Sequence, residues 1–430
     1  MATRTEELNR LTATEAARAI ASGQLKPEAL AESCLERIAA RGELKAWAYV
    51  DRDTALKNAR ICGQGVLRGI PVGVKDVIDT ADMPTEYGSV LHKGFRPDKD
   101  SACVAATRAS GGVILGKTAT TEFASPWQMG AKNPHDPTRT PGVSSSGSAA
   151  AVADFHVPLA FGTQTGGSTV RPASYCGIWG LKASLDGIDR GGVRHLKKSI
   201  DTLGVFARTL DDVNLFMAGL TNKPVGSLDG ASKPRIGICR TPEWKDAEPA
   251  TVEAIDRAKK ALEKAGAAVD EVELPRGYEH AMAAFRTITT RENLRTLMDE
   301  INRGEETLNP WIREGIAAAR QVGPTDYEMA NFGTGFYRQN YAKIFDSHDA
   351  LLTPSANGEA PKGLDGATLG QFNSFWTWMY GPALNIPAYL GPSKMPVGVT
   401  LVGKQGEDSR LLQTARWVER ALGTLPIQLG

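Results

Sequence analysis

Two kinds of hydrophobic pattern alternate along the chain. Near the start, apolar residues recur at helical spacing, with Thr12 and Glu15 forming a capping box and Pro27 beginning a second helix. The short runs "AWAYV" and "GIPVGV" are instead typical of strands; a helix begins between them at about Thr54, and the second run ends at Lys75. This alternation predicts an α/β fold.

The later pattern supports the same fold class. "ACVAATRASGGVILGKT" predicts helix, turn and strand, and "PRIGICR", "TVEAIDRAKKALEKAG" and "AAVDEVELP" predict a strand-helix-strand unit with parallel strands. Residues 278–345 are charged, helical in spacing and nearly free of strand signals, so we expect a helical layer beside the sheet and over part of a pocket. No repeat, low-complexity run or long linker interrupts the chain, which favours one domain over residues 1–430, with its core at about 65–215.

Composition narrows the partners. The 430 residues carry 50 basic and 49 acidic side chains, so charge gives no reason to expect binding to nucleic acid or to a membrane, and we expect a small-molecule partner. The N-terminal segment lacks the apolar core of a signal peptide or membrane span. Cysteines at positions 34, 62, 103, 176 and 239 form no metal-binding or CxxC spacing, which predicts reduced thiols in the cytoplasm. A homodimer is left open.

The candidate chemistry lies in three segments rich in glycine, serine or valine. "TPGVSSSGSAAA" and "GTQTGGSTVRPASYCG" place hydroxyls on glycine-rich turns, and "GIPVGVKDVIDT" places Lys75 among Val72, Val74 and Val77. Serines beside glycine are ordinarily turn formers and a single lysine is ordinarily solvated. Together, however, they are the groups needed to activate a serine without histidine, so the chain is interpreted first as a hydrolase.

These segments resemble the amidase signature family. The stretches from Gly142 to Ala153, from Gly162 to Ala173 and from Cys176 to Lys182 match its blocks almost position for position, and "LRGIPVGVKDVIDT" matches its upstream lysine block. "ALLTPSANGEAP" and "NIPAYLGPSKMPVGVTLVG" resemble its closing blocks, whereas residues 245–345 carry little of the likeness. The resemblance implies a three-layer α/β/α fold around a twisted, mixed, mostly parallel sheet, without metal or organic cofactor.

The resemblance also implies a catalytic triad. It places the nucleophile on Ser168, a bridging serine that follows a cis peptide bond on Ser144, and the base on Lys75. An ordinary lysine has a pKa of about 10.4, so burial must lower the pKa of Lys75 before it can accept a proton. Ser144 would then relay the proton from Ser168 to Lys75, with Ser145 in a supporting role.

The same block predicts how the negative charge of the transition state is stabilised. Backbone N–H groups of Thr165, Gly166, Gly167 and Ser168 would form the oxyanion hole. Two positions depart from the family pattern: Gln164 replaces an aspartate, and Arg171 stands three residues after the nucleophile instead of two, as in malonamidase-type bacterial enzymes. Arg171 would either bind a substrate carboxylate or make a structural ion pair.

Aromatic and sulfur-containing side chains point to a different substrate class. Trp127 and Met129 precede the serine loop, and "FNSFWTWMYGP" adds Trp378 and its neighbours. Each of them can line an apolar pocket or belong to the core. If half of these side chains face the cleft, it would accept an aryl amide or a carbamate (urethane) rather than a small acidic amide.

Other functional classes have weaker support. The chain has no G-x-S-x-G motif for a histidine-dependent serine hydrolase and no G-x-x-x-x-G-K-[ST] motif for nucleotide binding. A noncatalytic scaffold would tolerate loss of the triad residues, and all three are present. A glutamine-hydrolysing subunit of a transfer-RNA amidotransferase is the alternative that the resemblance itself leaves open. The main prediction is an amidohydrolase that cleaves the C–N bond of a small amide through an acyl-enzyme on Ser168.

Overall fold

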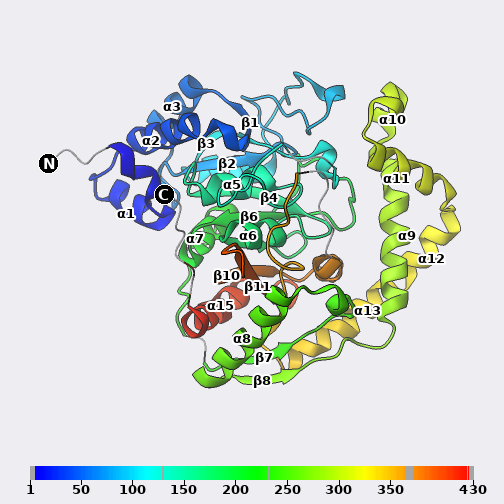
Figure 1. Ribbon diagram of the computed structural model, residues 1–430. Coiled ribbons are helices and arrows are strands. Elements are labelled where there is room, and N and C mark those ends of the chain that lie inside the picture. The colour runs from blue at the N-terminus through cyan, green and yellow to red at the C-terminus, as the bar shows by residue number, and fades with distance from the viewer. Residues whose placement is uncertain (1–4, 128–129, 231, 365–370, 424, 426–430) are drawn as a thin grey trace.

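One large sheet forms the centre of the protein. The computed structural model describes residues 5–127, 130–230, 232–364, 371–423 and 425 (Figure 1). In these residues eleven strands join in the order β1-β3-β2-β4-β6-β5-β10-β11-β9-β7-β8. They are β1 (Trp47–Val50), β2 (Pro71–Lys75), β3 (Val113–Thr118), β4 (Leu159–Gln164), β5 (Trp179–Lys182), β6 (Thr202–Ala207), β7 (Arg235–Ile238), β8 (Ala268–Glu271), β9 (Ala350–Pro354), β10 (Ala383–Leu390) and β11 (Pro396–Val402).

The sheet is mixed, as expected, but it is not mostly parallel. Strand β2 runs parallel to β3 and β4, and β7 runs parallel to β8 and β9. The other six pairings that the structure describes, which include all those in the middle of the sheet, are antiparallel. Helical crossovers give the parallel pairs, whereas β10 and β11 are joined by a short turn that leaves no room for a crossover.

Helices pack on this sheet in separate groups, which confirms the α/β class with flanking helices. Helices α5 and α6 contact each other and central strands, and α7 contacts β5 and β6 together with the helices α4, α15 and α1. The capping box at Thr12 is present and begins the first helix. The helices outside the 278–345 segment are α1 (Ala13–Ala21), α2 (Pro27–Ala40), α3 (Arg52–Arg60), α4 (Ala102–Ala109), α5 (Ser146–Ala153), α6 (Val170–Cys176), α7 (Leu210–Thr221), α8 (Pro249–Ala265), α14 (Ser374–Trp378) and α15 (Asp408–Leu422).

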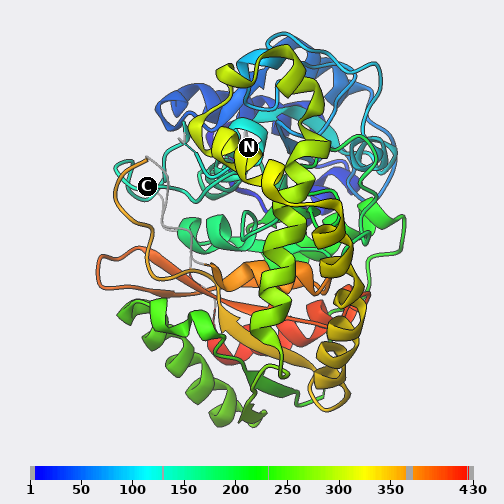
Figure 2. The same ribbon diagram turned by 90° about the vertical axis from the view of Figure 1, so that its right-hand side faces the viewer.

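The segment between β8 and β9 forms the expected helical layer. Its helices stand along one side of the molecule, and α9 crosses the face seen in Figure 2 as one long helix. Both α11 and α12 pack against α9. These helices are α9 (Tyr278–Thr296), α10 (Met298–Gly304), α11 (Pro310–Gln321), α12 (Pro324–Phe332) and α13 (Thr334–Ala342). Among the residues described, no helix is long and apolar enough to cross a bilayer.

A second apolar cluster fixes the helical layer to the sheet. Phe285 of α9 and Tyr341 of α13 pack with Phe375, Trp376 and Trp378 of α14. Their rings meet edge-on or tilted, with Phe285 and Trp378 at 5.9 Å between centroids. Large aromatic side chains contribute most of the apolar area in such a contact, so the cluster holds α9 and α13 against α14.

Candidate active site

Strand pairing brings the serine and lysine segments together. Lys75 is the last residue of β2, and β4 leads into the loop that carries Ser168. Because β2 and β4 are parallel neighbours, both chains leave the sheet at the same edge. Ser144 lies just before the start of α5, which packs against β2 and β4. The three segments identified in the sequence therefore meet at one place.

Lys75 is wholly buried among hydroxyl groups. Its Nζ donates hydrogen bonds to Ser144 Oγ at 2.8 Å, Ser145 Oγ at 3.0 Å and Thr163 Oγ1 at 2.7 Å. Burial lowers the pKa of Lys75 to about 7, and the charge of Asp201 opposes this effect only in part. A substantial fraction of Lys75 is therefore neutral near pH 7, as a proton acceptor requires.

Thr163 was not identified from the sequence. It lies inside the same glycine-rich block, on β4, so the block itself was the available signal. Which side chains of that block turn toward Lys75 depends on the pairing of β4 with β2, and the sequence does not give this.

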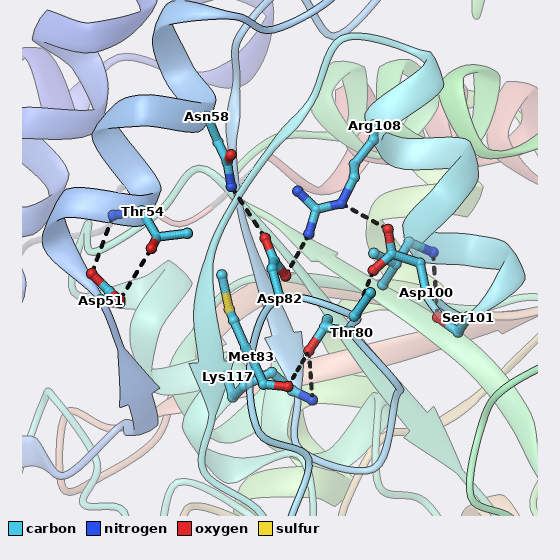
Figure 3. Close-up of polar contacts among 12 residues, drawn as sticks. Asp51, Thr54, Asn58, Thr80, Asp82, Met83, Asp100, Ser101, Arg108 and Lys117 are labelled. Carbon is cyan, nitrogen blue, oxygen red and sulfur yellow. Dashed lines mark hydrogen bonds and ion pairs between the residues drawn. The ribbon is translucent and has the colours of Figure 1, made fainter. Parts of the chain in front are cut away.

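A second buried lysine, on the neighbouring strand, has different partners from those of Lys75. Lys117 lies beside it on β3, where its Nζ donates to Ile78 O and Thr80 Oγ1 and forms an ion pair with Asp76 at 3.5 Å. Figure 3 shows Lys117 and Thr80 below a polar network in which Arg108 joins Asp82 and Asp100. A carboxylate stabilises the charge of Lys117, whereas the hydrogen-bond partners of Lys75 are neutral.

The backbone before Ser144 differs from the expectation. None of the peptide bonds that the structure describes is cis, so the predicted cis bond before Ser144 is wrong for this structure. The Lys75 contact is already made with a trans bond, which is the lower-energy form by about 3 kcal/mol for a residue other than proline. Gly142 has φ +110°, and a Cβ there would lie 2.6 Å from Pro172 of α6. Glycine thus lets the Ser144 loop pack directly on the helix that follows Ser168.

Ser145 connects the serine loop to β4. Its Oγ accepts from Thr163 N and donates to Thr163 O, both at 3.3 Å, and it also accepts from Lys75. A hydroxyl has one proton and two lone pairs, so these contacts use its full capacity. These contacts join the serine loop, β4 and Lys75, and the supporting role of Ser145 stays a prediction.

Ser168 lies on the wall of a cavity of about 260 Å³, with Thr165 and Gly166. In the part of the chain that the structure describes, its hydroxyl makes no hydrogen bond to Ser144. The N–H groups of Gly166, Gly167 and Ser168 likewise have no acceptor among the described residues. An oxyanion hole requires backbone donors that are not already paired, and these three N–H groups meet that requirement.

Gln164 holds this loop in place. Its Oε1 accepts from the N–H groups of Thr169 and Val170, both at 3.0 Å, and its Nε2 donates to Thr377 Oγ1 at 3.1 Å. A neutral amide can accept at one end and donate at the other, which a carboxylate cannot do. The departure from aspartate therefore ties the Ser168 loop to α14.

The cavity is lined by cationic and apolar side chains. Arg171, which is 3% exposed, reaches it and donates from Nη2 to Gly166 O at 3.2 Å, and burial lowers its pKa. Lys197, Phe285 and Trp311 also line it and were not identified from the sequence. Phe285 and Trp311 belong to the helical layer, whose position over part of the pocket was expected.

Two of the side chains expected to line the pocket, Trp378 and Trp127, do not line this cavity. Trp378 is 1% exposed and packs in the core against Phe285, because α14 turns its rings toward the helical layer. Trp127 is partly exposed and is not among the residues that line the cavity. Met129 lies outside the described residues.

Metal-ligating groups lie elsewhere. Among the described residues, no Asp, Glu, His or Cys lines the cavity. His92, Asp299 and Glu300 do cluster, but Glu300 already bonds His92 at 2.8 Å and Arg194 at 2.7 Å. A guanidinium on the same carboxylate opposes binding of a further cation there.

Comparison with known proteins agrees with this geometry. The Amidase family profile matches residues 29–412. One relative, the Glutamyl-tRNA(Gln) amidotransferase subunit from Acidothermus cellulolyticus, is 32% identical over 96% of this chain and 95% of its own length. A solved structure described as an amidase superimposes with a TM-score of 0.88 at 28% identity, covering 96% of this chain and 100% of that one. The native peptide amidase from Stenotrophomonas maltophilia gives a TM-score of 0.83 at 26% identity, over 97% and 98% of the two chains. The chain therefore belongs to the amidase family.

Proposed function

We propose that this protein hydrolyses the C–N bond of a small amide through an ester formed on Ser168. The observation that carries the proposal is the burial of Lys75 against Ser144, with a pKa lowered to about 7. A neutral amine that accepts from a serine hydroxyl supplies the base that a serine nucleophile needs. The proposal assigns residues 1–430 to one catalytic domain, because the cavity takes residues from both the Ser168 loop and the helical layer.

The proton route follows the hydrogen bonds. Neutral Lys75 takes the proton of Ser144 Oγ while Ser144 takes that of Ser168, whose oxygen attacks the amide carbonyl. The hydroxyl of Ser168 is unengaged, and the proposal requires that it turn toward Ser144 about its χ1 bond. The N–H groups of Gly166, Gly167 and Ser168 bind the oxyanion, and Thr165 adds the fourth predicted donor.

Two half-reactions complete the cycle. The relay reverses to protonate the leaving nitrogen, which departs as ammonia or an amine and leaves an ester on Ser168. Water then loses a proton through the same groups, attacks the ester and releases the carboxylic acid. The substrate, one water and the two products balance, and Lys75 ends neutral.

The cavity lining supports a small amide with an anionic group. Arg171 and Lys197 both line it, and Phe285 and Trp311 add apolar lining. An aryl amide or carbamate is the alternative that these two aromatic rings favour. Relative values of kcat/KM for monoamides of dicarboxylic acids, anilides and aryl carbamates decide between them, and exclusive use of anilides would contradict the acidic substrate.

A second candidate function is release of ammonia from glutamine as a subunit of an amidotransferase. The name of the relative from Acidothermus cellulolyticus favours it, at 32% identity over nearly both chains. The alignment spans 487 positions, more than the 430 residues of this chain, so the relative has internal segments that this chain lacks. This candidate is tested by measuring glutamine hydrolysis by the purified chain alone and by the chain mixed with a cell extract that supplies partner subunits. Activity that appears only with the extract supports the subunit role.

Substitution of Ser168 tests the mechanism. Ser168→Ala is expected to abolish turnover and labelling by a serine-directed fluorophosphonate, while Ser146→Ala, at the start of α5, serves as the serine control. Mass spectrometry of the labelled peptide locates the adduct. An adduct on any other serine, or full activity of Ser168→Ala, would falsify the assignment.

A further inference from the structure

Lys197 is a buried ammonium group beside the catalytic loop, and the proton route does not use it. It is 7% exposed and lines the same cavity as Ser168. Its Nζ donates to Oδ1 of Asn293, a residue of α9 that also lines the cavity. Among the residues described, Lys197 forms no ion pair. A buried cation with a single neutral partner is costly unless an anion joins it.

The nearest carboxylates are engaged elsewhere. Asp201 accepts from the hydroxyl of Thr165 with one oxygen and from the backbone N–H groups of Leu196 and Lys197 with the other, each of these two at 2.8 Å. Glu292 accepts from Ser199 N at 3.3 Å and from Tyr327 Oη at 3.4 Å. Both charges attract Lys197, and neither carboxylate reaches its Nζ within ion-pair distance. The two remaining protons of the ammonium group are therefore available to a ligand.

Asp201 also connects the Lys197 segment to the loop that carries Ser168. One carboxylate bonds both the backbone of Lys197 and the side chain of Thr165, which belongs to the oxyanion loop. Lys197 and Ser168 thus line one cavity of about 260 Å³ and are held by a shared anchor. A small molecule can contact both at once, which a remote ion site would not allow.

Asn293 supplies a further donor. Its Oδ1 accepts from Lys197, and no hydrogen bond among the described residues uses its Nδ2. A Cβ on Gly315 of α11 would lie 2.9 Å from that Nδ2, so glycine at this position leaves the amide its place. An ammonium and an amide N–H side by side match the two oxygens of a carboxylate.

We propose that Lys197 and Asn293 form a carboxylate-binding subsite, so that the physiological substrate is an amide carrying a carboxylate within reach of its scissile bond. This inference rests on the proposed function. It separates the roles of the two pocket cations: Arg171 supports the oxyanion loop through Gly166 O, whereas Lys197 binds the substrate.

Kinetics with paired substrates test the inference. The panel pairs a monoamide of succinic or glutaric acid with its neutral methyl ester, and L-glutamine with its methyl ester, which lacks the carboxylate but keeps the α-amino group. Lys197→Met is expected to lower kcat/KM for the carboxylates about ten- to hundredfold, with less than about threefold change for the esters. Lys197→Arg is expected to recover part of the loss, and Lys198→Met, an exposed neighbour, to leave both values unchanged. Equal losses on both members of a pair, or none, would overturn the proposal.

Binding without turnover separates this inference from the proposed function. Calorimetry on Ser168→Ala compares its affinities for succinate, glutarate and L-glutamate with its affinity for neutral succinamide. Dicarboxylates are expected to bind, and to bind at least tenfold more weakly once Lys197→Met or Asn293→Leu is added. If Ser168→Ala binds dicarboxylates in this way but the wild-type protein hydrolyses no amide, the proposed function is refuted and the subsite is retained. Amide hydrolysis with no dependence on either residue would refute the subsite alone. Asn293→Leu keeps the test decisive if Lys197→Met does not fold.

Discussion

Lys75→Met tests the central chemical claim, because methionine keeps much of the length of lysine but cannot be charged. Lys75 is fully buried, and desolvation lowers its pKa from 10.5 to about 7. Its Nζ donates to the hydroxyls of Ser144, Ser145 and Thr163, and these three bonds are lost in the variant at every pH. The pH-dependent part of the stability change therefore reports on the proton of Lys75 alone.

The size of that part follows from linkage. The pKa of Lys75 falls from 10.5 in the unfolded chain to about 7 in the folded protein. Below pH 7 this difference lowers the free energy of unfolding by about 5 kcal/mol, and above pH 10.5 the cost has disappeared. Between these values the unfolded chain binds a proton that the folded protein does not, so stability rises with pH. From pH 7 to pH 9 the wild type should gain about 2 kcal/mol relative to Lys75→Met. Because the comparison is between two proteins, the other buried lysines cancel.

Urea unfolding followed by tryptophan fluorescence measures this difference at pH 6.5, 7, 8 and 9. Lys198→Met, which removes an exposed lysine, should show no such trend. In parallel, kcat/KM of the wild type should rise with an apparent pKa of about 7, as the free enzyme gains neutral Lys75. A stability difference that stays flat across this range would mean that Lys75 keeps an ordinary pKa in the fold, and the neutral-base mechanism would then be refuted.

Three further substitutions test the surrounding loops. Gln164→Leu removes an acceptor from two backbone N–H groups at the start of α6, so we expect a loss of about 1 to 3 kcal/mol in urea unfolding; an unchanged midpoint would contradict the anchoring role. Gly167→Ala introduces a Cβ at φ +133°, 2.7 Å from an arginine nitrogen, and should lower kcat/KM at least tenfold, as steady-state kinetics would show. Ser145→Ala deletes one of three acceptors that favour the charged form of Lys75, so the apparent pKa of the rate profile should fall; a rise would argue against that contact.

Much of the fold was predictable because the relevant signals are local. The capping box at Thr12, the apolar run that ends at Lys75 and the helical spacing after residue 278 each produced the expected element. That most pairings are antiparallel was not predictable, since the middle of the sheet depends on contacts between distant segments, such as that of β5 with β10, which no local pattern encodes. The expected cis bond before Ser144 likewise came from resemblance and is absent from the described backbone.

The sequence by itself determined the inventory of the site: its ordered glycine-serine blocks and the lysine at a strand end are visible in the letters alone. Only the tertiary structure decided which groups surround each buried lysine, since Lys75 meets three hydroxyls whereas Lys117 meets Asp76. It also placed Trp378 in the core and brought Lys197 and Trp311 to the cavity. The reason is physical: burial, charge pairing and hence pKa depend on neighbours far away in sequence, and the packing of the helical layer on the sheet supplies them.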